Sequence, residues 1–153
     1  MTLKETLLND LKEAMKAQDK GRLQVLRSLK AKILEKEISI RTGGKGDISD
    51  EQVTEVLVKA AKQRRESMDQ FQKGGREDLV AQEEAELAII ESYLPEQMGE
   101  DEIRAAVKEG IAATGASGMQ DMGRVMGMMM GKLKGKADGS AVNRIVKEEL
   151  SAL

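Results

Sequence analysis

Pro95 is the only proline in the chain, within the stretch Leu94-Pro95-Glu96-Gln97-Met98-Gly99. Proline has no backbone amide proton and pushes the preceding residue out of the helical region, so a helix must end here. The rest of the sequence is rich in Leu, Ala, Glu, Lys and Met, which favours helix almost everywhere else. We therefore predict an all-α protein with a bundle of about four helices over 1–94, a linker over 95–99 and a smaller three-helix unit over 100–153.

Apolar spacing and capping residues predict the individual helices. The apolar residues recur at helical spacing over about 2–18, 22–40, 49–73, 76–93 and 100–113, and again in a last helix that carries Val142, Ile145, Val146 and Leu150. Ser49 with Gln52, and Ser117 with Gln120, have the spacing of capping boxes, and Asp138 has the position of an N-cap. Glycines mark the breaks, with Gly43, Gly44 and Gly46 in a loop over 41–47 and Gly74-Gly75 at the end of the third helix.

Residues 123–135 read G-R-V-M-G-M-M-M-G-K-L-K-G, with a glycine at every fourth position. On a helix, Gly123, Gly127, Gly131 and Gly135 form one ridge without side chains. The apolar face beside it consists of Met122, Val125, Met126, Met129, Met130 and Leu133, whereas Met128 lies off that face and is expected to be exposed. Each glycine inside a helix costs roughly 0.5–1 kcal/mol relative to alanine, which indicates that another backbone comes close. That backbone belongs to a neighbouring helix, a protein partner or a nucleic acid.

Basic residues accompany the ridge in a chain whose net charge is only −2. They are Arg124, Lys132, Lys134 and Lys136, with Arg144 on the helix that follows. Positive side chains beside a bare backbone suit a phosphate chain, because phosphate contacts need charge and close approach rather than base-specific groups. Phe71 and Tyr93 are the only aromatic residues, which argues against base stacking. A helical protein–protein adaptor is the alternative, with either the glycine–methionine face or the Lys59–Arg65 face as its docking surface.

The composition gives little support for an enzyme or a membrane protein. The chain has no cysteine and no histidine, so thiol nucleophiles, histidine bases and zinc sites built on these residues are excluded. Gly131-Lys132 is followed by Leu133 rather than by Ser or Thr, so it is not a phosphate loop. We predict no catalytic residues, no cofactor and no metal. No apolar run approaches the ~20 residues that span a bilayer, and we expect a cytoplasmic protein.

Two motifs are similar to a known family. The run from Gly75-Arg76-Glu77-Asp78-Leu79 to Tyr93-Leu94-Pro95-Glu96-Gln97 resembles the YqeY protein family. The same is true of Gly123-Arg124-Val125-Met126-Gly127 and of Gly135-Lys136-Ala137-Asp138-Gly139-Ser140. The resemblance covers essentially the whole chain. The same two-part unit is similar to the C-terminal tail of the B subunit of tRNA-dependent amidotransferases.

The resemblance implies a role rather than a reaction. Those enzymes convert Glu-tRNA(Gln) or Asp-tRNA(Asn) to the amidated form with glutamine as nitrogen donor, and their tail is implied to contact the tRNA. Their catalytic domains are absent here, so carbon–nitrogen ligase activity attaches to this chain by association only. The implied partners are tRNA and an aminoacyl-tRNA amidotransferase or another translation component. The implied tRNA-facing positions are Arg124, Gly127, Lys132, Lys134 and Lys136.

Overall fold

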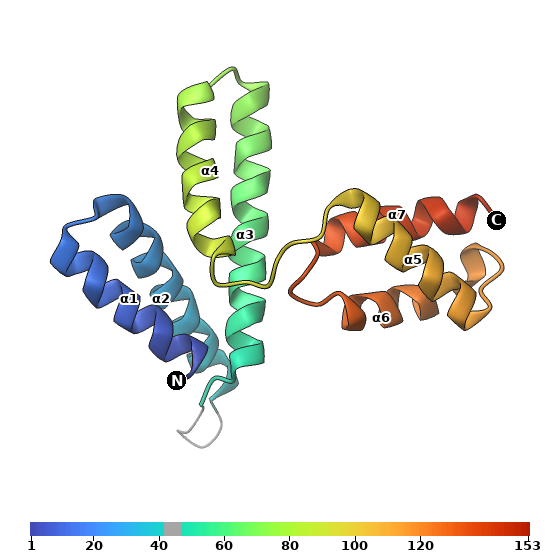
Figure 1. Ribbon diagram of the computed structural model, residues 1–153, viewed down its shortest axis with the longest axis horizontal. Coiled ribbons are helices and arrows are strands. Elements are labelled where there is room, and N and C mark those ends of the chain that lie inside the picture. Colours follow the sequence, from blue (N-terminus) through green and yellow to red (C-terminus); the bar gives the residue numbers. More distant parts are fainter. Residues whose placement is uncertain (42–46) are drawn as a thin grey trace. The chain divides into compact units, whose positions relative to one another are not determined.

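A computed structural model of the chain describes residues 1–41 and 47–153. Every regular element in these two ranges is a helix, which confirms the all-α prediction (Figure 1). The glycine loop expected over 41–47, with Gly43, Gly44 and Gly46, lies mostly outside the described residues. The contacts of the chain divide it into two compact units, Met1–Leu94 and Pro95–Leu153.

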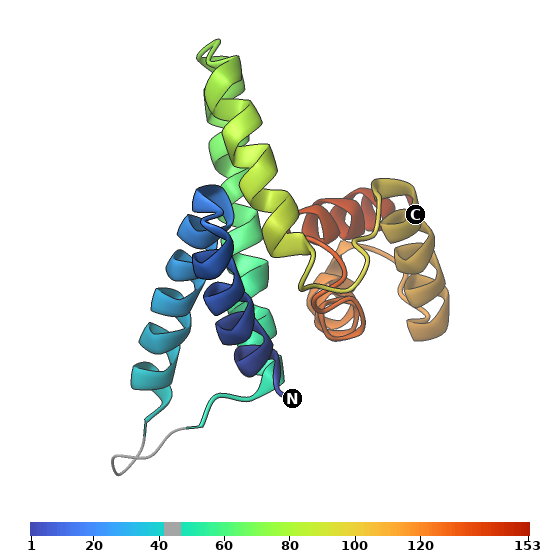
Figure 2. The same ribbon diagram turned by 60° about the vertical axis from the view of Figure 1, so that its left-hand side comes forward.

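The N-terminal unit is built from two helical hairpins, α1–α2 and α3–α4 (Figure 2). Its helices are α1 (Leu3–Ala17), α2 (Lys20–Ile40), α3 (Asp50–Lys73) and α4 (Glu77–Glu91). All four contribute to one apolar core, which contains Leu7, Leu11, Ala14, Val25, Leu26, Leu29, Ile33, Val53, Leu57, Ala60, Ala61 and Ile90. The buried residues of α3 all lie in its first half. The second half of α3, together with the beginning of α4, extends beyond α1 and α2.

Local capping sets the ends of α3 as predicted. Ser49 Oγ accepts a hydrogen bond from the Gln52 backbone amide at 3.1 Å, and Gln52 Oε1 accepts one from the Ser49 amide at 3.0 Å. This reciprocal pair satisfies two amide groups that a helix leaves without intrahelical partners. Gly74 is the C-cap of α3. The predicted capping box and the predicted glycine stop are both confirmed.

Tyr93 joins the end of α4 to α1 and α2. Its hydroxyl donates to Asp10 Oδ2 at 2.6 Å and accepts from Arg22 Nη2 at 2.9 Å. Burial and the hydrogen bond to Asp10 raise the pKa of Tyr93 from 10.0 to about 12. The neutral phenol therefore stabilises the N-terminal unit.

This shifted pKa makes the unit sensitive to alkali. We expect the phenolate absorbance of Tyr93, the only tyrosine, to have its midpoint near pH 12 in the folded chain and near 10 in denaturant. Because the folded pKa is the higher one, the stabilisation is complete below pH 10 and is lost as the pH rises from 10 to 12. An ultraviolet titration measures the midpoint, and Tyr93→Phe removes this part of the pH dependence. A native midpoint at 10 contradicts the prediction.

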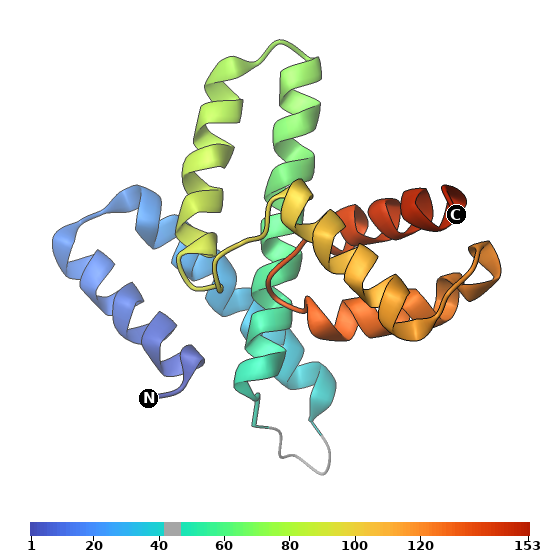
Figure 3. The same cartoon turned by 45° about the vertical axis from the view of Figure 1, so that its right-hand side comes forward.

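The C-terminal unit is a three-helix arrangement in which each helix packs against the other two (Figure 3). Its elements are α5 (Glu100–Thr114), a 3-10 turn η1 (Met119–Asp121), α6 (Met122–Lys132) and α7 (Gly139–Ser151). The core consists of Ile103, Val107, Ile111, Val125, Met129, Leu133, Ala137, Val142, Ile145, Val146 and Leu150. Asp138 caps α7 by accepting from the Ser140 amide at 3.3 Å, as predicted.

The entry to α6 differs from the prediction. A capping box of Ser117 and Gln120 is wrong, because η1 comes between Gly118 and α6. The Ser117 amide instead donates to Asp121 Oδ2 at 2.9 Å, and Ser117 Oγ accepts from Gln120 Nε2 at 3.1 Å. The side chain of Asp121 therefore holds the turn that leads into α6.

The glycine ridge is shorter than predicted. α6 ends at Lys132, so only Gly123, Gly127 and Gly131 lie on it. Gly135 is buried in the following turn with a φ of +77°, in the left-handed region that favours glycine. Gly135 is therefore required by the turn and does not continue the ridge.

Candidate nucleic-acid interface

One face of α6 fixes the helix in the C-terminal unit. Val125 and Met129 of α6, and Leu133 directly after its end, follow at four-residue spacing and are buried in the core with residues of α5 and α7. At about 100° per residue, the glycines lie on the opposite side of the helix. We call the surface formed by Gly123, Gly127 and Gly131 the glycine face.

The glycine face is open within this unit. All three glycines are exposed, and a Cβ atom built on any of them meets nothing within 4 Å. A neighbouring helix of the C-terminal unit therefore does not explain their presence. Of the three alternatives that the sequence left open, a neighbouring helix of this unit is excluded, and a backbone from outside the unit, protein or nucleic acid, remains.

The close approach inside the unit occurs at Gly110 of α5, which sequence reasoning missed. A Cβ atom at Gly110 would lie 2.5 Å from Met129 Sδ and 2.8 Å from Met128 Cε. Met128 is thus half-buried against the core, and the prediction that it is exposed is wrong. Met130 is exposed instead, at 43%, although it was assigned to the apolar face. An isolated glycine in an otherwise regular helix was the only signal for Gly110.

Cations lie at both ends of the glycine face. Arg124 is in the first turn of α6, and its Nη2 atom contacts Asp121 Oδ1 at 3.1 Å while the side chain stays 57% exposed. Lys132 ends the helix, and Lys134 and Lys136 follow on the next turn, all three exposed. Four cations and one carboxylate, that of Asp121, therefore lie on this surface, which gives it an excess of positive charge.

The backbone that carries the last two lysines is fixed by residues after Pro95. Gln97 Nε2 donates to the Gly135 carbonyl at 2.9 Å, and the Met98 amide donates to the Lys136 carbonyl at 2.8 Å. Residues 95–99, expected as a linker, are thereby attached to the C-terminal unit. Two motifs of the family resemblance, far apart in the sequence, meet at these hydrogen bonds.

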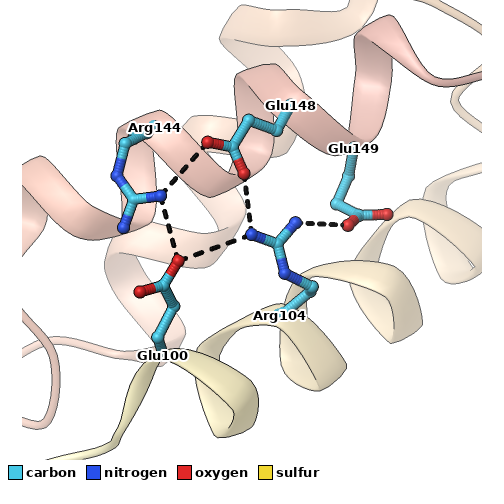
Figure 4. Close-up of polar contacts among 5 residues, drawn as sticks. All are labelled: Glu100, Arg104, Arg144, Glu148 and Glu149. Atoms are coloured by element: carbon cyan, nitrogen blue, oxygen red, sulfur yellow. Dashed lines mark hydrogen bonds and ion pairs between the residues drawn. The ribbon is translucent and has the colours of Figure 1, made fainter.

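Arg144 lies in a different environment, an ion network between α5 and α7 (Figure 4). Its Nη1 atom contacts Glu100 Oε1 at 3.0 Å and Glu148 Oε1 at 3.1 Å. Arg104 contacts Glu148 at 2.7 Å and Glu149 at 2.6 Å. Three carboxylates and two guanidinium groups leave this network with a negative excess. The structure therefore groups Arg144 with acids rather than with the cations of α6, which argues against a phosphate contact there.

The same network predicts a pH dependence. Hydrogen bonds from Arg104 and then Arg144 hold the pKa of Glu148 below its ordinary value of 4.5. A lowered folded-state pKa stabilises the protein above the unfolded-state value and ceases to do so as the pH falls. We expect Glu148→Gln to lower the melting temperature near neutral pH, and the difference from wild type to shrink below pH 4.5. Melting curves across pH test this, and a difference independent of pH contradicts it.

Two of the four cations of the Lys59–Arg65 face, the other surface considered for a partner, are occupied within the N-terminal unit. Arg64 Nη1 contacts Glu86 Oε2 at 3.1 Å and Glu83 Oε2 at 3.4 Å, and Arg65 Nη2 contacts Glu91 Oε1 at 3.0 Å. These contacts join α3 to α4. The two arginines thus stabilise the hairpin and are not free to dock a partner.

Candidate metal clusters and membrane-spanning helices are absent from residues 1–41 and 47–153. In that part of the chain, no three His, Cys, Asp or Glu side chains lie where they could together hold a metal ion. None of its helices has the length and apolar character needed to cross a membrane.

Comparison with known proteins identifies relatives along most of the chain. The Yqey-like protein family matches residues 4–150. Altered inheritance of mitochondria protein 41, mitochondrial, from Eremothecium gossypii is 40% identical over 88 residues, which are 58% of this chain and 46% of that protein. The protein of the same name from Pyrenophora tritici-repentis is 34% identical over 122 residues, 76% of this chain and 65% of the relative. The chain thus spans about half to two thirds of the length of these relatives. With nearly all of its residues matched, the chain belongs to the Yqey-like protein family.

Proposed function

We propose that this protein binds tRNA through the phosphate backbone, as a non-catalytic accessory protein acting near aminoacyl-tRNA amidation. The observation that carries the proposal is the open glycine face with Arg124 at one end and Lys132, Lys134 and Lys136 at the other. No side chain on this face keeps a phosphate chain at a distance from the helix. The cations at its ends supply the charge that phosphates require.

The dimensions of the face support a backbone contact. Gly123 and Gly131 are eight residues apart, which corresponds to about 12 Å along an α-helix. Such a length reaches more than one phosphate along a strand, since successive phosphate charges of one strand are about 3.4 Å apart along the axis of duplex DNA. With only two aromatic residues in the chain, recognition rests on charge and shape rather than on base stacking.

The link to amidation rests on the resemblance to the amidotransferase tail. Ligase activity with glutamine as nitrogen donor belongs in that setting to other domains, so we expect no amidation of Glu-tRNA(Gln) by the purified chain alone. An aminoacyl-tRNA amidotransferase or another translation component is the proposed protein partner. A cytoplasmic location is part of the proposal, and the mitochondrial names of the relatives provide the alternative that cell fractionation distinguishes.

A titration of fluorescent tRNA over a salt series tests the proposal. Changing Lys132, Lys134 and Lys136 together to Gln is expected to weaken binding at low salt by about tenfold or more. The triple change is also expected to reduce the slope of log affinity against log salt by roughly two, because each lost phosphate contact removes about 0.7–0.9 from that slope. The matched control changes Lys12, Lys16 and Lys20 of the N-terminal unit to Gln, with the same loss of charge. Equal effects of the two triple variants contradict the proposed interface.

A protein–protein adaptor that uses the same face is the second candidate. Met130 at the edge of the glycine face is 43% exposed, and flexible methionines are common on adaptable protein-binding surfaces. Binding of an amidotransferase that survives nuclease treatment and high salt, and that is weakened by Met130→Ser, favours the adaptor. Binding that disappears with the RNA favours the first proposal.

A further inference from the structure

An apolar groove lies between α1 and α2 of the N-terminal unit, far in sequence from the candidate RNA interface. It has a volume of about 170 Å³ and is lined by Lys4, Leu7, Leu8, Leu26, Lys30, Ile33, Leu34 and Glu37. Five of these eight residues are aliphatic. A cavity of about 150 Å³ with such a lining accommodates benzene, so this groove has room for an apolar side chain.

Exposed apolar side chains extend the groove along α2. Leu34 is 52% exposed and Ile38, one turn further on, is 57% exposed. Neither belongs to the core face of α2, which buries Leu29 and Ile33. Two large aliphatic side chains at four-residue spacing beside an apolar groove form the pattern on which amphipathic helices dock.

The rim of the groove is positive. Lys30 lines the groove, Arg27 lies about one turn before it on α2, and both are exposed. Glu37 is the only acidic residue in the lining, and its Oε1 atom contacts Lys4 Nζ at 2.5 Å, so its charge is neutralised. A partner with carboxylates beside its apolar anchors therefore complements the groove in charge as well as in polarity.

We propose that this groove, with Leu34 and Ile38, binds an acidic amphipathic helix of a protein partner. One apolar side chain of that helix enters the groove, and another packs on Leu34 and Ile38. Carboxylates on its flanks pair with Arg27 and Lys30. The site is separate from the glycine face and does not depend on RNA binding.

The test uses a defined probe and the full chain. A labelled amphipathic helix of about 18 residues carries Leu on one face and Glu on its flanks, and a second version carries Lys in place of each Glu. We expect Leu34→Ser with Ile38→Ser, and Arg27→Glu with Lys30→Glu, each to weaken the acidic probe at least about tenfold, or 1.4 kcal/mol. Met119→Ser, an exposed apolar change in the other unit, is the matched control and leaves this binding unchanged.

Three results overturn the proposal. The first is equal affinity for the acidic and the basic probe, or an acidic probe that binds the Leu34→Ser, Ile38→Ser variant as tightly as wild type. The second is binding to phosphatidylglycerol vesicles that requires Leu34 and is not displaced by the acidic probe, which assigns the groove to a lipid surface. The third is self-association in sedimentation that requires Leu34, which assigns it to a second copy of the chain. Circular dichroism confirms that each variant is folded.

Discussion

Replacing Gly123, Gly127 and Gly131 together by alanine is expected to stabilise the C-terminal unit by about 1.5–3 kcal/mol. Each glycine is exposed on α6, and a Cβ atom at each position meets nothing within 4 Å. Alanine therefore gains helix propensity without a steric penalty. Unfolding in urea, followed by circular dichroism, measures the change. Gly110→Ala is the comparison: it gains the same helix propensity, but its Cβ would lie 2.5 Å from Met129 Sδ and must displace that side chain, so we expect less stabilisation than at an α6 glycine.

The same triple variant is expected to bind tRNA more weakly, since three methyl groups on the glycine face keep the phosphate backbone away from α6. A variant that is more stable but binds less well is the signature of a surface retained for a partner rather than for folding. The stability of the triple variant and its affinity for tRNA are measured separately, and either can depart from its expected change without the other. Greater stability with unchanged affinity for tRNA excludes the glycine face as the RNA contact and leaves the adaptor as the explanation for the glycines.

Much of the fold follows from local patterns. The capping box at Ser49, the N-cap at Asp138 and the helix stop at Gly74 each depend on contacts within a few residues, and all three were predicted. The helices were predicted to within a few residues, because apolar spacing reports which face of each helix is buried. The predicted capping box at Ser117 failed because Asp121, four residues further on, accepts the Ser117 amide instead.

The candidate site could be predicted only in part, because the exposure of a glycine and the ion pairs of an arginine depend on the tertiary structure. A glycine ridge has the same spacing whether a helix covers it or solvent does, so the sequence could not distinguish Gly127, which is open, from Gly110, which is crowded. Arg144 was predicted as a nucleic-acid contact from its charge and position, and only the structure shows that it contacts Glu100, 44 residues away. Gly135 continued the four-residue spacing by chance, since a turn and not a helix requires it.

Ile145→Ala is expected to unfold the C-terminal unit and to abolish tRNA binding while the N-terminal unit stays folded. Ile145 on α7 is 0% exposed in the core shared by α5, α6 and α7. Truncating a buried isoleucine to alanine costs about 2–5 kcal/mol, and a core in a unit this small rarely supplies more than about 3–5 kcal/mol. In thermal unfolding, we expect the variant to lose the transition of the C-terminal unit. Tyr93 keeps its raised pKa because it belongs to the other unit.

Leu29→Ala is the matched change in the other core. Leu29 on α2 is 1% exposed, so its truncation destabilises the N-terminal unit by a similar amount. Where Leu29→Ala unfolds the N-terminal unit, the pKa of Tyr93 returns toward 10. If the RNA contact lies on α6, the same variant keeps a folded C-terminal unit that still binds tRNA. The opposite pattern, with tRNA binding retained in Ile145→Ala and lost in Leu29→Ala, moves the RNA contact to the N-terminal unit. The two variants together therefore assign the binding activity to one unit without reliance on any single surface residue.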